Sequence, residues 1–227
     1  MSNVLIDNEQ EQVKQHPSML GIVWSPIEQF ERIKEKPKVL VPMIILTLIW
    51  GIAGAMLSFG MDIKWLLASI PPEQHAEFAQ MESFLRISSF IGYLITPIVV
   101  ILIVSAIMLL ISKATTSEVT FKQLFSMNVF ISFIGALSLL VNGGLAILLD
   151  VDPMIPITSV GNMMQAEGVA GAILNQVELF AVWGVILTAL GLIKVANFHR
   201  VLAWSVSIIF TLVTVGFAVI GALLGGM

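Results

Sequence analysis

The chain has 227 residues, of which 57% are hydrophobic and 11% charged, and its mean hydropathy is +0.97. This composition excludes an ordinary soluble domain and indicates an integral membrane protein. The net charge of −4, with basic residues scattered among apolar runs, argues against a nucleic-acid partner. The absence of cysteine excludes disulfides, thiolate catalysis and thiolate metal sites.

Residues 1–18 are polar and end in His16-Pro17-Ser18, so we expect a flexible tail. Acidic residues and the lack of a short apolar core argue against a cleavable signal peptide. Residues 19–227 are expected to form one all-α membrane domain with five transmembrane helices and short amphipathic helices at the interfaces.

A charged amphipathic segment occupies residues 24–37, W-S-P-I-E-Q-F-E-R-I-K-E-K-P. The serine, the proline and a glutamate three residues after the serine predict a helix start. Ile27, Phe30 and Ile33 share one side of the wheel, and Glu28 can pair with Arg32. Because a long apolar run follows, we expect this helix to lie on the membrane surface, with packing against a partner as the alternative. The residues nominated for contact with lipid or a partner are Trp24, Phe30, Arg32, Lys34 and Lys36.

The first two spans are expected at residues 39–59 and 87–111. In the first, the pairs Gly51/Ala55 and Gly54/Ser58 predict a close helix contact, which we assign to packing within the chain rather than to a dimer. Between the spans, a second amphipathic helix is expected after Pro71-Pro72, running into the second span.

The remaining spans are expected at residues 121–149, 177–196 and 201–224. Thr120 and Gln123 form a capping signal for the third span. That span is long for an upright helix, so it either tilts or breaks at Asn142-Gly143-Gly144. The connection from residue 150 to 176 is expected to be a loop with one short helix.

The basic residues indicate the orientation. With five spans, nine Lys and Arg residues lie on the side of the amino-terminal tail and two, Lys64 and Arg86, on the other. The positive-inside rule then places the N-terminus in the cytoplasm and the C-terminus outside.

Few residues in the spans can do chemistry. The three histidines lie in separate segments outside the spans, and no H-E-x-x-H, G-x-S-x-G or phosphate-binding loop occurs, so we expect no enzyme, cofactor or metal site. The charged residues in the spans are Lys122, Glu178 and Lys194, and each lies near an end. Glu178 is expected in water at the outer interface, with a buried contact as the alternative. A polar cavity inside the membrane layer would contradict this interpretation.

Two further groups of residues are candidates for function. The intramembrane polar candidates are Asn128, Asn142 and Glu178, and with Ser132 and Ser138 the two asparagines line the polar path that a channel or carrier for small solutes would need. The outer-face candidates are the flexible methionines and acids that suit contact with varied partners: Met154, Met163, Met164, Asp150 and Asp152.

Three motifs carry a resemblance to a known family. They are W-S-P-x-x-x-F-x-x-I-x-x-x-P at residues 24–37, T-F-K-Q-L-F-S at 120–126 and W-x-x-x-L-x-x-x-G-L-x-x-V at 183–195. In these and in its five spans the chain resembles the bacterial branch of the Yip family, named for Ypt-interacting proteins. Eukaryotic members are linked to Rab-type GTPases and vesicle traffic. Bacillar members whose amino-terminal segment is similar to residues 17–37 are associated with ABC exporters that protect the cell from peptide toxins.

The resemblance implies no catalytic residues. It favours an accessory protein of the bacterial cell membrane that assists an ABC-type exporter, with the lipid bilayer, other membrane proteins and a second copy of itself as candidate partners. The small-solute channel or carrier is the alternative.

Overall fold

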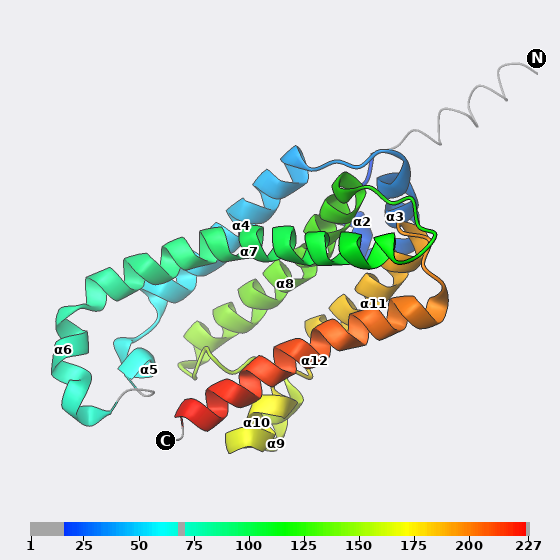
Figure 1. Cartoon of the computed structure of the whole chain (residues 1–227). Helices are drawn as coiled ribbons and strands as arrows, with labels where there is room; N and C mark the ends of the chain where they lie inside the picture. The colour runs from blue at the N-terminus through cyan, green and yellow to red at the C-terminus, as the bar shows by residue number, and fades with distance from the viewer. Residues whose placement is uncertain (1–15, 68–70, 226–227) are drawn as a thin grey trace, which may run out of the picture.

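The computed structural model describes residues 16–67 and 71–225. In Figure 1, five apolar helices run between two ends of the molecule, in alternating directions. Their bounds are α4 Leu40–Gly60, α7 Glu82–Lys113, α8 Phe121–Leu149, α11 Leu179–Lys194 and α12 Arg200–Gly225. The described part of the chain has no strand beyond an isolated bridge between Ser159 and Glu178. The predicted all-α membrane fold is therefore confirmed. Of the predicted tail, residues 1–15 lie outside the described residues.

Four of these helices, α4, α7, α8 and α12, are long and apolar enough to cross a membrane. The fifth, α11, has 16 residues, about 24 Å of helix, against a hydrocarbon core of roughly 30 Å. It is shorter than the predicted span of residues 177–196 because its first turn begins after Glu178, which caps it.

The central helix is α8, which contacts α4, α7 and α11. Its predicted capping box is present: the Thr120 hydroxyl accepts from the Gln123 backbone N–H at 3.3 Å, and the Gln123 side chain accepts from the Thr120 N–H at 2.8 Å. The helix continues through Asn142-Gly143-Gly144, so the predicted alternative of a break is wrong. A Cβ on Gly143 would lie 3.0 Å from Leu57 of α4, so packing holds this stretch helical.

The small residues of α4 face α7. A Cβ on Gly54 would lie 2.5 Å from the Cβ of Tyr93, closer than real Cβ contacts allow. Gly54 is therefore required for the close approach of two helices of the same chain, as predicted.

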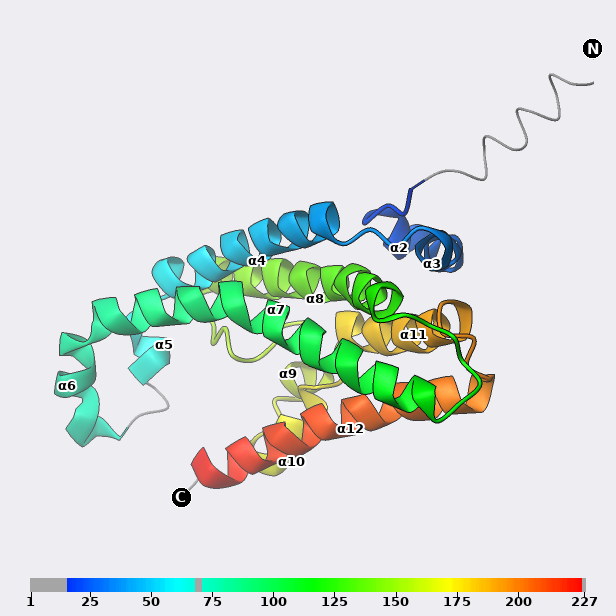
Figure 2. The ribbon, with the colours of Figure 1, turned by 45° about the horizontal axis from the view of Figure 1, so that its top comes forward.

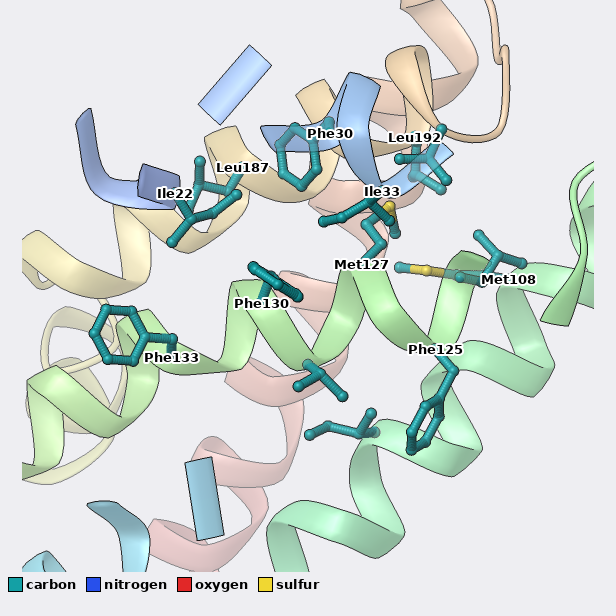
Figure 3. Packing of buried hydrophobic residues seen from close by; sticks show 14 of the residues in the cluster. Ile22, Phe30, Ile33, Met108, Phe125, Met127, Phe130, Phe133, Leu187 and Leu192 are labelled. Atoms are coloured by element: carbon teal, nitrogen blue, oxygen red, sulfur yellow. The ribbon is translucent and has the colours of Figure 1, made fainter. Parts of the chain in front are cut away.

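At one end, the short helices α2 (Gly21–Trp24) and α3 (Pro26–Glu35) cover α8 and α11. Figure 3 shows Phe30 and Ile33 pointing into a cluster with Met127 and Leu192, and both α3 side chains are fully buried. Phe30 and Ile33 thus contact the protein's own helices, which corrects the expected position of Phe30 at the membrane surface. Gly191 makes room for it, since a Cβ there would lie 3.2 Å from the Phe30 ring.

The start of α3 also differs in detail from the prediction. Pro26 is at its first position, but the Ser25 hydroxyl makes no capping bond; it donates to the Gly21 carbonyl at 3.3 Å and accepts from Gln29 at 3.3 Å. The predicted ion pair of Glu28 with Arg32 is present.

The other short helices form two separate groups, one before α7 and one between α8 and α11 that lies beside α12 (Figure 2). Before α7 come α5 (Ile63–Leu67), a 3₁₀ turn (Pro72–Gln74) and α6 (His75–Gln80), and between α8 and α11 come α9 (Val160–Met164) and α10 (Gly168–Leu174). The expectation of one helix between residues 150 and 176 is therefore wrong. Gln165 ends α9 and Gly168 begins α10, and both have a positive φ.

Candidate functional site

A cavity of about 450 Å³ lies among α7, α8, α11 and α12. Most of its wall is apolar, but each helix except α7 adds polar side chains. These are Asn128, Ser132 and Ser138 of α8, Thr188 of α11, and Ser207, Thr211 and Thr214 of α12; the loop before α11 adds Gln176. Glu178 lies in the wall beside the start of α11. We call this space the central cavity.

Glu178 is buried, with 8% of its surface exposed. One carboxylate oxygen accepts from the Ala181 N–H at 2.9 Å and the Ser138 hydroxyl at 3.0 Å. The other accepts from the Phe180 N–H at 3.2 Å and the Thr158 hydroxyl at 2.9 Å. The expectation that this carboxylate lies in water is wrong, and the buried alternative is right.

The burial of Glu178 follows from the path of the loop before it. The Val160 N–H donates to the Val177 carbonyl at 2.9 Å, so the loop doubles back over the end of α11 and brings Thr158 onto the carboxylate. Contacts of this kind satisfy a buried charge that would otherwise be costly. Thr158 was missed in the sequence, where it is one threonine in an irregular loop with no periodic signal.

Asn142 belongs to the same network without lining the cavity. Its oxygen accepts from the Thr158 N–H at 3.0 Å and from the Thr158 hydroxyl at 3.1 Å, and its amide nitrogen donates to Ser138 at 3.1 Å. We call Ser138, Asn142, Thr158 and Glu178 the polar network; it joins α8, the loop and α11.

Asn128 lies deeper, away from this network. Its amide donates to the Ser105 hydroxyl at 2.9 Å and to the Met108 sulfur at 3.5 Å, so it joins α8 to α7 in the wall of the central cavity. The three intramembrane candidates are therefore split: Asn142 and Glu178 share one network, and Asn128 stands apart.

A second cavity, also about 450 Å³, lies on the other side of α7, against α4. Trp50, Tyr93, Thr96 and Ser132 line it, and Ser132 lines the central cavity as well. The indole N–H of Trp50 is buried without a hydrogen-bond partner. Polar side chains thus line part of two spaces between the apolar helices.

The outer-face candidates do not form one site. Asp150 accepts from Lys64, with Trp65 3.4 Å away, and these contacts hold the pKa of its carboxyl below its usual value. Asp152 accepts from the Met154 backbone N–H at 2.8 Å. Met154 is exposed and borders a small cavity beside α4 and α7, whereas Met163 and Met164 are exposed on α9.

A polar cleft of about 660 Å³ lies between α3 and the ends of α8 and α11, and Lys34 is the one α3 candidate among its lining residues. Lys34 lines it and donates to Asn197 at 2.6 Å, and Lys194 pairs with Glu31 across it at 2.7 Å. Lys36 is exposed, and Trp24 is 83% exposed. We call this the α3 cleft.

Fold and cavities together define a polytopic helical membrane protein with polar space between its helices. Residues 20–223 match the Yip1 domain. The chain is 33% identical over 214 residues to "Membrane protein YknW" of Bacillus subtilis (strain 168), covering 93% of this chain and 92% of that protein. The chain therefore belongs to the Yip1-domain family. No solved structure matches it.

Proposed function

We propose that the protein is a non-enzymatic accessory protein of the bacterial cell membrane that binds an ABC-type exporter through the α3 cleft. The observation that carries this proposal is a charged cleft whose walls are held in place by the protein's own contacts. The family resemblance supplies the class of partner.

The position of α3 is fixed before any partner arrives. Hydrogen bonds from α8 add to the burial of the apolar side chains of α3. The Gln123 side chain donates to the Lys34 carbonyl at 2.7 Å, and the Ser126 hydroxyl donates to the Lys38 carbonyl at 2.6 Å. The ion pair of Lys194 with Glu31 ties α3 to α11. A surface that is already ordered loses less entropy when it binds, so it suits a docking site.

The chemistry of the cleft favours a protein over anionic lipid. Glu31 and Glu35 lie in its wall beside Lys34 and Lys194, so a lipid phosphate would meet acids as well as bases. Mixed charge suits a protein interface, and Trp24, which precedes α3 in the chain, adds an exposed aromatic side chain outside the cleft.

In the proposed topology all five helices cross the membrane. The polar network at the start of α11 and Lys194 at its end suit the two interfaces, and local thinning of the bilayer accommodates its short length. The basic ends of α3, α7, α8 and α11 then face the cytoplasm, and the C-terminus faces outward. A reporter fused after Met227 tests this, since activity in the cytosol would contradict it.

Photo-crosslinking tests the partner. A photoreactive amino acid replaces Trp24, and the tagged protein is isolated in mild detergent. We expect crosslinks to an ABC-type permease or ATPase, and loss of these crosslinks with Glu35→Lys. In the control, the photoreactive amino acid replaces Met163 instead of Trp24. Glu35→Lys should leave the crosslinks formed from position 163 unchanged. Recovery of the protein alone from every detergent would overturn the proposal.

The alternative, a small-solute carrier, is favoured by one observation: Ser132 lies in the walls of both cavities, so polar space continues across α8 beside α7. Flux of neutral solutes into liposomes that hold only this protein, abolished by Ser132→Leu, would support it. Equal flux in empty liposomes would reject it.

A further inference from the structure

We propose that the central cavity binds a lipophilic molecule with a single positive charge, and that Glu178 is its counter-charge. This inference goes beyond the proposed function because it needs no partner protein and concerns the interior of the helix bundle rather than the α3 cleft.

The shape of the cavity sets the size of the ligand. On α11, Phe180, Ala181, Gly184, Val185 and Thr188 recur on one helix face along the wall. From residue 178 to residue 188 the helix rises about 15 Å. A volume of about 450 Å³ with a mostly apolar wall matches a ligand of drug size with a large apolar body.

The charge of the cavity sets the sign of the ligand. Glu178 is the only acid among the residues that line it, and no basic side chain lines it. Among the described residues, Glu178 also has no partner in an ion pair. The N-terminus of α11 offsets roughly half a charge, which leaves a net negative field in a medium of low dielectric. A monocation neutralises that field, whereas an anion would add to it.

The hydroxyl groups of the wall point to the same ligand. Thr188 donates to the Gly184 carbonyl at 2.8 Å, and Ser207 donates to the Val185 carbonyl at 2.7 Å. Ser138 donates to Glu178 itself. Because these three hydroxyl protons are already used, Thr188, Ser207 and Ser138 offer the cavity oxygen lone pairs, which stabilise positive charge and hydrogen-bond donors.

The arrangement of the helices gives the ligand a way in from the membrane. Both α7 and α12 line the cavity, yet α7 packs on α4 and α8 while α12 packs on α11 and α10. A lipophilic cation concentrated in the bilayer can enter between these two helices.

The test compares two probes of similar shape and opposite charge, tetraphenylphosphonium and tetraphenylborate. Equilibrium dialysis measures their binding to the full chain in nanodiscs of phosphatidylcholine, with empty nanodiscs subtracted. We expect saturable binding of the cation near one per chain and no saturable binding of the anion. Glu178→Gln should weaken cation binding about tenfold, in line with the loss of one partly neutralised charge.

Two glycine variants separate binding from folding. A Cβ on Gly184 or on Gly92 meets no atom within 4 Å; Gly184 lines the central cavity and Gly92 the second cavity. Gly184→Leu should abolish cation binding while Glu178 stays in place, and Gly92→Leu should leave it unchanged. Equal binding of both probes to the wild type, or unchanged cation binding in either Glu178→Gln or Gly184→Leu, would overturn the proposal.

Discussion

The two sides of α8 pack in opposite ways. Toward α3, large side chains such as Phe30, Met127 and Phe130 interlock with no exposed surface (Figure 3). Toward α7 and α12, small and hydroxyl-bearing residues such as Ser132, Gly184 and Thr211 leave the central cavity. Residue size therefore decides which part of the bundle is a rigid support and which part has room for a ligand.

The largest effect is expected on the packed side, with Phe30→Ala. The substitution leaves a cavity among α3, α8 and α11, and should lower the free energy of unfolding by about 3–5 kcal/mol. Ile27→Ala is the matched control on the same helix, because Ile27 is 45% exposed, and should cost less than about 1 kcal/mol. Denaturation followed by circular dichroism measures both, and equal losses would show that α3 is not packed as described.

The second-largest loss of stability is expected from an added methyl group at the close contact of α4 with α7. Gly54→Ala places a methyl group against Tyr93, and should cost about 1–3 kcal/mol. Gly92→Ala in α7 meets open space, and should be neutral or stabilising by up to about 1 kcal/mol through helix propensity. If both variants unfold at the wild-type temperature, α4 and α7 lie farther apart than the structure places them.

The polar network should show an intermediate effect. Thr158→Ala removes the hydroxyl whose single proton lies between the acceptors of Glu178 and Asn142, and should cost about 1–3 kcal/mol because a buried acceptor loses its partner. Thr214→Ala is the control, since that hydroxyl donates only to Thr211 of its own helix. Thermal unfolding in detergent compares the two, and a larger loss for Thr214→Ala would contradict the network.

Local signals in the sequence predicted the helices better than the site. The capping box at Thr120 sets the first residue of α8, and the predicted bounds of 121–149 are confirmed. The glycines at 143 and 144 suggested a break because propensity ignores the packing of Gly143 on Leu57. The central cavity had no local signal, because it depends on how four helices are rotated relative to one another.

The burial of Phe30 and of Glu178 was missed for a related reason. The amphipathic pattern of α3 is the same whether its apolar face meets lipid or protein, and Gly191 of α11, 161 positions away, decides between them. Glu178 is near the end of a span by sequence, but the loop carrying Thr158 covers it. Long-range contacts of this kind leave no periodic trace.

The smallest effect is expected outside the bundle, at the pair of Asp150 with Lys64. Lys64 holds the pKa of Asp150 below its usual value, so the pair stabilises the fold above the unfolded-state pKa near 3.9 and loses this effect as the pH falls through the lower, folded-state pKa. Asp150→Asn keeps the left-handed conformation at this position, which asparagine tolerates. The variant should therefore melt slightly below the wild type at pH 7 and together with it once the pH lies below both pKa values. Melting temperatures measured from pH 7 down to a pH below both pKa values test this, and a difference that stays constant over that range would show that the charge of Asp150 does not hold α5 to the end of α8.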